Sequence, residues 1–316
     1  MSCTTVILYS HPLTENLANE VIDECYQNHL EVIKGDILWK RFQDEWPNLF
    51  ITDVKNKCSR KHVVFIGSLH SPDIIFEQIA ILYSLPRYLC QSFIFILPYF
   101  PTATMERVDT EGRVATASTM ARILSAIPLS SQGPCQIIIF DIHALQERFY
   151  FGDTVIPRLE SAIPLLLKEL DKASHHRKIS ITFPDDGAYK RFHTMFESRY
   201  SFVTCIKIRN DDERVIKIKE GTIENCHCVI VDDLVMTGET LIECAKVLKD
   251  SGALSVSAYV THAVFPKDSW KRFTKTDLFE TFYITDTIPH AREISKHRPF
   301  KLLSISKIIS KILQSE

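Results

Sequence analysis

Two adjacent aspartates stand at the end of an apolar segment in the string VIVDDLVMTGETL, in the second half of the chain. Asp232 and Asp233 follow the apolar residues directly, and Gly238 makes a turn before the next apolar segment. Successive backbone amides in such a turn, together with the start of a helix, form a cradle for a monoester phosphate. The carboxylates supply the acceptors that neighbouring sugar hydroxyls need. The string therefore predicts a pentose phosphate site made of Asp232, Asp233, Leu234, Val235, Met236, Thr237, Gly238, Glu239 and Thr240.

A basic pair lies in the string FPDDGAYKRF, where Lys190 and Arg191 follow an apolar segment and a turn at Gly187. The planar guanidinium of arginine can hold a phosphate at two points, whereas the lysine ammonium acts as a point charge. A basic pair standing alone is most often a solvated surface. The role of this pair therefore depends on the string around it.

The composition is that of an ordinary globular protein, with 45% hydrophobic and 24% charged residues among 316. The formal net charge is -2, which gives no basic footprint for nucleic acid, so any phosphate site must be local. The longest apolar run, residues 93–100, is far shorter than the ~20 residues that cross a bilayer. The nine cysteines are scattered through apolar segments, and no secretory signal precedes them. We expect a soluble cytoplasmic protein with reduced thiols that binds neither nucleic acid nor a membrane.

Short apolar strands alternate with helical segments along the chain, which predicts an α/β fold with mainly parallel sheets flanked by helices. Ligands of such folds bind at the carboxyl ends of the strands. Strands are expected at residues 5–9, 62–66, 93–97, 136–140, 179–183, 229–231 and 255–261, and helices at residues 73–84, 115–126 and 239–251.

The length favours two domains, because single cores rarely grow to this size. A strand, a loop and a helix recur in the segments that start at Val63 and Val229, a weak internal repeat that favours two similar domains. The first is expected over residues 1–147 and the second over residues 148–299. An amphipathic helix over residues 300–316 is assigned to the first domain, although its pattern leaves either domain open.

Several strings together resemble one enzyme family. VIVDDLVMTGETL resembles the phosphoribosyl pyrophosphate signature shared by phosphoribosyltransferases and by ribose-phosphate diphosphokinase, also called phosphoribosyl pyrophosphate synthetase. FDIHALQERF, FPDDGAYKRF and the charged segment IKIRNDDERVIKIKEG resemble, in order and spacing, the DLHA, SPD..GAKR and catalytic-loop motifs of the synthetase. PYFPTATMERVDTEGRVATASTMARIL resembles the ATP loop of the phosphate-independent, plant-type (class II) branch. The resemblance covers most of the chain from about Lys61 to Phe273.

The resemblance implies two similar phosphoribosyltransferase-like domains and a defined reaction. The β,γ-diphosphoryl group of ATP would pass to the anomeric hydroxyl of ribose 5-phosphate, giving 5-phosphoribosyl 1-diphosphate and AMP. Lys190, Arg191 and Arg209, the last on a charged loop, would clamp the transferring phosphates. His143, expected at a strand end, would bind the magnesium ion on ATP, with a proton-accepting role or a place in the core as alternatives. Asp185 is the second magnesium ligand in this assignment, with Asp186 and Asp153 as alternatives.

The resemblance also implies an ATP site near a subunit interface of a homo-oligomer. In RFQDEWPNLFI, Phe42 would stack on the base and Asp44 would accept from its amine, although Trp46 replaces the usual acidic residue. The ATP loop would add Phe100 and Thr102, by stacking and backbone contacts, and then Arg107 and Asp109.

Three departures or alternatives remain. Glu239 stands where the family usually has a small residue, and its carboxylate is expected to weaken phosphate binding by like-charge repulsion. A phosphoribosyltransferase would need a base-binding hood and would not need His143 or Lys190. A catalytically silent subunit associated with a synthetase would typically lose catalytic-loop residues, yet His143, Lys190, Arg191 and Arg209 are all present.

Overall fold

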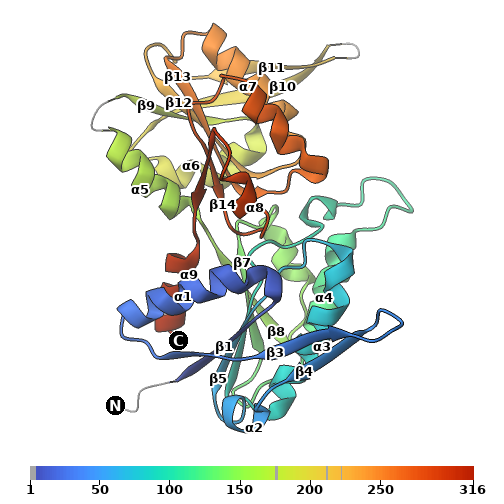
Figure 1. The fold of residues 1–316 in the computed structure, drawn as a ribbon. Helices are drawn as coiled ribbons and strands as arrows, with labels where there is room; N and C mark the ends of the chain where they lie inside the picture. The colour runs from blue at the N-terminus through green and yellow to red at the C-terminus, as the bar shows by residue number, and fades with distance from the viewer. Residues whose placement is uncertain (1–4, 175–176, 211–212, 222) are drawn as a thin grey trace. The chain divides into compact units, whose positions relative to one another are not determined.

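The computed structural model of the chain describes residues 5–174, 177–210, 213–221 and 223–316, with the backbone alone at residues 103, 207–210 and 213–215. The chain forms two compact units (Figure 1). Unit 1 comprises the residues up to Ser161 together with Ile305–Glu316, and unit 2 comprises Ala162–Ser304. The boundary expected at residue 147 falls earlier than the one between the units, because β8 (Val155–Glu160) still pairs with β7 (Cys135–Phe140) of unit 1.

Unit 1 is built on a six-stranded sheet in the order β2-β1-β5-β6-β7-β8. Every neighbouring pair of strands is parallel, as expected when helices connect consecutive strands. The other strands of this sheet are β1 (Val6–Ser10), β2 (Val32–Lys34), β5 (His62–Ile66) and β6 (Ser92–Ile96). The helices of unit 1 are α1 (Glu15–Gln27), α2 (Val54–Lys57), α3 (Ile75–Ser84), α4 (Thr116–Ser125) and α9 (Ser306–Gln314).

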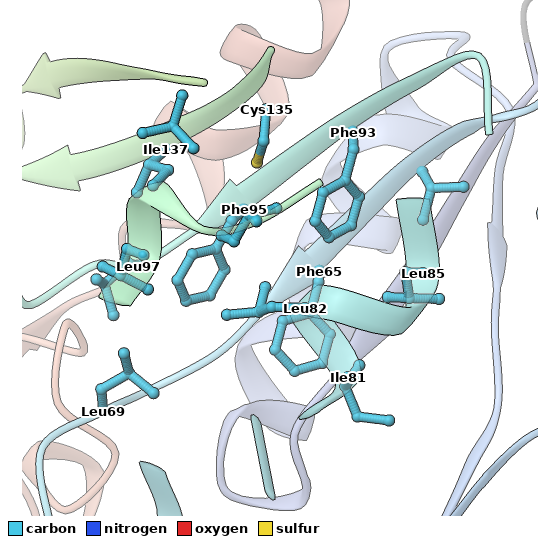
Figure 2. Packing of buried hydrophobic residues seen from close by; sticks show 14 of the residues in the cluster. Phe65, Leu69, Ile81, Leu82, Leu85, Phe93, Phe95, Leu97, Cys135 and Ile137 are labelled. Carbon is cyan, nitrogen blue, oxygen red and sulfur yellow. The ribbon is translucent and has the colours of Figure 1, made fainter. Parts of the chain in front are cut away.

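Both faces of this sheet are buried. Phe65 and Phe95 belong to a core cluster that includes Leu82 of α3, and their ring centroids lie 5.9 Å apart (Figure 2). The alternate residues of the same strands, such as Val64 and Ile94, point to the opposite face and are buried as well. Along α1, residues 17, 18, 21 and 25 are buried at helical spacing, and α1 packs beside α9 (Figure 1).

An antiparallel hairpin extends from unit 1 outside the parallel sheet. Strands β3 (Ile37–Arg41) and β4 (Pro47–Ile51) pair with Arg41 opposite Pro47. The hairpin turn therefore carries the residues of RFQDEW that were expected to reach the ATP base.

Unit 2 is built on a seven-stranded sheet in the order β11-β10-β9-β12-β13-β14-β15. All its pairs are parallel except the hairpin of β10 and β11. The strands are β9 (Ile179–Phe183), β10 (Ser201–Asn210), β11 (Glu213–Glu220), β12 (His227–Val235), β13 (Ser255–Ala263), β14 (Phe282–Thr285) and β15 (Phe300–Leu303). The helices are α5 (Ile163–Ser174), α6 (Asp186–Phe196), α7 (Glu239–Asp250) and α8 (Ala291–Ile294).

Helices also cover the sheet of unit 2. Leu241 and Leu248 of α7 are buried in the same cluster as Ile230 of β12. Phe196 of α6 meets Phe183 of β9 with ring centroids 6.4 Å apart. The carboxyl ends of the strands are consequently the places where charged groups can reach water.

The predicted α/β class with mainly parallel, helix-flanked sheets is confirmed, but two local expectations are wrong. Residues 300–303 do not begin a helix, because they form β15 and pair in parallel with Phe282–Thr285; the helix begins only at Ser306. The segment expected as a charged loop forms β10 and β11, with Cys205 opposite Ile218 and Arg209 opposite Arg214.

The eight cysteines among the described residues carry free thiols, and all are buried. Within the same described ranges, no helix combines the length and the apolar character needed to cross a bilayer.

The core of unit 1 makes a prediction about stability. Phe95 is fully buried, so Phe95→Ala should lower the free energy of unfolding by about 3–5 kcal/mol through lost burial and a new cavity. Tyr26→Ala is the control, because Tyr26 is 82% exposed and its loss should change stability little. Urea unfolding followed by circular dichroism measures both, and equal midpoints would contradict the assignment of Phe95 to the core.

Candidate functional site

The acidic pair lies where β12 leaves the core of unit 2. Asp233 is 5% exposed and Asp232 is half-buried. The Asp233 amide donates to Asp232 Oδ1 at 3.0 Å, and the Leu234 amide donates to Asp233 Oδ1 at 2.8 Å. Each carboxylate is thus held by the backbone of the next residue, which fixes both at the end of the strand.

The electrostatics of this strand end favour an incoming cation. Burial, together with the nearby carboxylates of Asp233 and Asp185, raises the pKa of Asp232 well above its ordinary value. The guanidinium of Arg191 partly offsets this crowding, with Nη1 lying 3.8 Å from Asp233 Oδ2 and both side chains largely buried. Carboxylates from β12 and from the start of α6 therefore share one corner of unit 2 with an arginine.

The turn after β12 requires glycine. Gly238 has a φ of +80°, in the left-handed region, and directly precedes α7. A Cβ atom at this position would lie 2.4 Å from two ring atoms of Phe273. Thr237 is exposed and Thr240 is half-buried, and the two residues flank the turn.

A segment that the sequence analysis did not select supports this turn. We name residues Pro266–Lys275, which follow β13, the supporting segment. Its Ser269 Oγ donates to the Met236 carbonyl at 2.9 Å, and the Phe273 ring lies against Gly238. No spacing rule could have found this contact, because 33 residues separate Ser269 from Met236 and β13 lies between them.

The supporting segment also contacts Glu239, the residue that departs from the family pattern. Arg272 Nη1 lies 3.2 Å from Glu239 Oε1. The carboxylate expected to repel phosphate is consequently paired with a cation.

The geometry of α6 turns the two members of the basic pair, Lys190 and Arg191, in different directions. Asp185 caps the helix, accepting from the Ala188 amide at 3.0 Å through Oδ1. Adjacent residues on a helix point about 100° apart, so Arg191 turns towards Asp233 whereas Lys190 is exposed. Asp186 is exposed and pairs with Lys219 at 3.0 Å. The backbone of Arg209 lies in β10, and its side chain is outside the described residues.

In unit 1, His143 lies just beyond the carboxyl end of β7 and is exposed. The turn that carries it is held by Glu147, a fully buried residue whose Oε1 accepts from the Ala144 amide at 3.0 Å. His143 is therefore placed at the strand end where the sequence expected it. Asp153, the alternative ligand, is also exposed.

The predicted ATP loop is only partly as expected. Phe100 is 1% exposed and packs against Phe151 at 5.7 Å between ring centroids, so its ring belongs to the core and cannot stack on a base in this conformation. Thr102 has a φ of +61°, and its buried Oγ1 has no hydrogen-bond partner among the described residues. Arg107 pairs with Glu106 at 2.9 Å and Asp109 pairs with Arg113 at 2.7 Å, and both are exposed.

The β3–β4 hairpin presents aromatic side chains and contacts the largely buried carboxylate of Glu77 through Arg41. Phe42 is 56% exposed and Asp44 is exposed at the turn, where its Oδ1 accepts from the Trp46 amide at 3.3 Å. Next to the hairpin turn, Arg41 Nη2 lies 3.4 Å from Glu77 Oε2, and His11 Nε2 lies 2.8 Å from Glu77 Oε1. Burial lowers the pKa of His11, so the neutral imidazole donates to the Glu77 carboxylate.

No group of three or more His, Cys, Asp or Glu side chains that could hold a metal ion occurs in the described part of the chain. A magnesium ion bound here would take most of its ligands from a substrate or from water. Asp185 lies in unit 2 and His143 lies in unit 1.

The fold and the acidic strand end with its glycine turn define a phosphoribosyltransferase-like α/β protein. The chain matches the model of the N-terminal domain of ribose phosphate pyrophosphokinase over residues 6–127, and that of the phosphoribosyl synthetase-associated domain over residues 214–315. It is 48% identical to ribose-phosphate pyrophosphokinase 4 of Arabidopsis thaliana, over 95% of this chain and 89% of the relative. The chain belongs to the ribose-phosphate pyrophosphokinase family.

Two further comparisons agree with the plant-type resemblance and with the fold. The chloroplastic ribose-phosphate pyrophosphokinase 3 of Arabidopsis thaliana is 48% identical, over 99% of this chain and 76% of the relative. The crystal structure of phosphoribosylpyrophosphate synthetase from Mycobacterium smegmatis superimposes with a TM-score of 0.83, covering 99% of this chain and 98% of that one at 19% identity. The second comparison supports the two-sheet architecture alone.

The glycine turn gives a prediction with a matched control at the other end of the same helix. Gly238→Ala should abolish saturable binding of a sugar phosphate, because the left-handed backbone is strained and the new Cβ must displace Phe273. Gly252→Ala imposes the same kind of strain, with a φ of +92°, but its Cβ would have no neighbour closer than 4.0 Å. Calorimetric titration with ribose 5-phosphate compares the two variants, and equal affinities would contradict the assignment of the turn.

Proposed function

We propose that the protein transfers the β,γ-diphosphoryl group of ATP to the anomeric hydroxyl of ribose 5-phosphate, giving 5-phosphoribosyl 1-diphosphate and AMP. The observation that carries this proposal is the 48% identity to a ribose-phosphate pyrophosphokinase over 95% of the chain. The acidic strand end and glycine turn of unit 2 fit the sugar substrate of that activity.

The sugar phosphate is assigned to the turn after β12. The backbone amides from Thr237 to Thr240 and the two threonine hydroxyls bind the 5-phosphate. Asp232 and Asp233 accept hydrogen bonds from the ribose hydroxyls, for which their backbone-held carboxylates are already oriented. Because these acceptors are fixed before the substrate arrives, little conformational freedom is lost on binding.

Three cations are assigned to the transferring phosphates. Lys190 is exposed and meets the negative charge that develops as the diphosphoryl group leaves AMP. Arg191 contributes from beside Asp233, where it also steadies the acidic corner. Arg209 is assigned on the family resemblance, since its side chain lies outside the described residues.

ATP is assigned to unit 1. Phe42, with its exposed ring, stacks on the base, and Asp44 accepts from the amine. Thr102, Arg107 and Asp109 complete the contacts of the ATP loop, and Phe100 contributes only through its backbone. Since the hairpin turn is exposed, we propose that ATP binds near a subunit interface of a homo-oligomer. We also propose that the protein acts in the cytoplasm.

Magnesium is the implied cofactor, and the residues present fit a loosely held ion. Asp185 provides a carboxylate and His143 an exposed imidazole, each in its own unit. This small number of protein ligands is enough for an ion that keeps several waters and binds mainly to phosphate oxygens. When bound with ATP, magnesium would neutralise charge on the phosphates, and His143 of unit 1 and Asp185 of unit 2 are the two candidate protein ligands.

The activity itself is tested by mixing purified protein with ATP, magnesium and ribose 5-phosphate and measuring AMP by chromatography. We expect AMP and 5-phosphoribosyl 1-diphosphate in equal amounts, and no product after magnesium is removed with a chelator. Retained ribose 5-phosphate binding without any AMP would contradict the enzyme assignment and favour a silent subunit of a synthetase.

The role assigned to Lys190 can be tested by its removal. Because its charge is needed mainly in the transition state, Lys190→Ala should lower kcat by two or more orders of magnitude while the affinity for ribose 5-phosphate changes little. The control is Lys246→Ala, which removes an exposed lysine on α7. Steady-state AMP formation gives kcat and the KM for ribose 5-phosphate. Wild-type turnover in Lys190→Ala would refute the assignment of Lys190 to the transferring phosphates.

A further inference from the structure

The supporting segment brings a cation to the edge of the sugar phosphate loop. Arg272 Nη1 lies 3.2 Å from Glu239 Oε1, and the two side chains are 38% and 70% exposed. Glu239 is the first residue of α7, so its carboxylate stands beside the amides at the helix start. These amides are the groups that bind the phosphate in the proposed function.

Stability alone does not account for this ion pair. Its contribution to the stability of the fold is modest, because exposed ion pairs are screened by water and cost side-chain freedom. The pair lies instead at the start of α7, where its charges would act on a bound anion. A lone carboxylate beside a dianionic phosphate would repel it, and the paired guanidinium cancels that repulsion.

The guanidinium has further donors to offer. Arginine carries five N–H groups in a planar fork, and its contact with Glu239 uses one edge. The Phe273 ring lies against Gly238, and the neighbouring Arg272 is 38% exposed and contacts the first residue of α7. The contact with Glu239 thereby holds the guanidinium at the edge of the turn, with donors left for an anion bound there.

We propose that Arg272 binds the 5-phosphate of ribose 5-phosphate and that Glu239 orients its guanidinium for this contact. The inference rests on the proposed function, because it adds a residue to the same sugar phosphate site. Glu239 is then a positioning residue, which gives a physical reason for a carboxylate at a place where small residues are usual.

The direct test is the affinity of Arg272→Gln for ribose 5-phosphate, measured by calorimetry without ATP. We expect a loss of about 10- to 100-fold, the scale of a charge-assisted contact with phosphate. Arg272→Lys, which keeps the charge but not the fork, should lose less. The control is Lys271→Gln, because Lys271 is the neighbouring exposed cation and pairs with Asp268 at 2.7 Å. An unchanged affinity in folded Arg272→Gln, or an equal loss of affinity in Arg272→Gln and Lys271→Gln, would overturn the proposal.

A second variant separates phosphate binding from simple neutralisation of Glu239. If Arg272 only cancelled the carboxylate, Arg272→Gln combined with Glu239→Gln would bind ribose 5-phosphate like the wild type. Direct binding predicts that the double variant stays at least about 10-fold weaker. Recovery of wild-type affinity in the double variant would overturn the proposal.

Glu239 has its own readout. As a positioning residue, Glu239→Ala should raise KM for ribose 5-phosphate with kcat nearly unchanged, and Glu239→Gln, whose amide oxygen still accepts, should restore most of the loss. A carboxylate that merely repelled phosphate would give the opposite sign, with KM falling in Glu239→Ala.

The affinity measurements and the AMP assay can fail independently. AMP formation together with Arg272→Gln binding at wild-type strength would sustain the proposed function and overturn the role of Arg272. Binding that depends on Arg272, in a protein that forms no AMP, would sustain the role of Arg272 and overturn the proposed activity.

Discussion

Burial of both faces of each parallel sheet is the constraint on which the site depends. Residues 228–231 of β12 are each 0% exposed, and a charge placed among them would suffer a large desolvation cost. Charged groups can therefore begin only after this stretch, and Asp232 and Asp233 are the first two positions that follow it. The same crowding that places them together raises the pKa of Asp232, which is why the corner needs Arg191 as a counter-charge.

The shape of the loop beyond this strand end is set by the aromatic core of unit 2. Phe273, which lies against Gly238, also packs against Phe282 and Phe300, with ring centroids 5.0 and 6.0 Å away. The left-handed turn is consequently continuous with packing that the unit needs in order to fold. A loop fixed in this way presents its amides without first having to order them, which favours binding of a small anion.

The sequence predicted the parts of the molecule that are local. Continuous apolar runs located seven central strands, and the contiguous string around Asp233 located the acidic strand end and the glycine turn that follows it. Features that depend on distant packing were missed or misread. Residues 300–303 share an apolar pattern with the helix that follows, and only their pairing with β14 makes them a strand. Phe100 looked available to a ligand until its packing against Phe151 placed it in the core, and nothing in the sequence brings the supporting segment to the turn after β12.

The two members of the basic pair illustrate how local geometry assigns different tasks to neighbours. Both lie on α6, but one helical step rotates Arg191 into the acidic corner and leaves Lys190 in solvent. An arginine already 3.8 Å from a carboxylate has part of its charge committed before any substrate binds. A solvated lysine can instead respond to charge that appears only during the reaction, and it sits one residue from the arginine that steadies the sugar site. In the proposed function, the helix thereby links the binding of ribose 5-phosphate to a cation for the group in transfer.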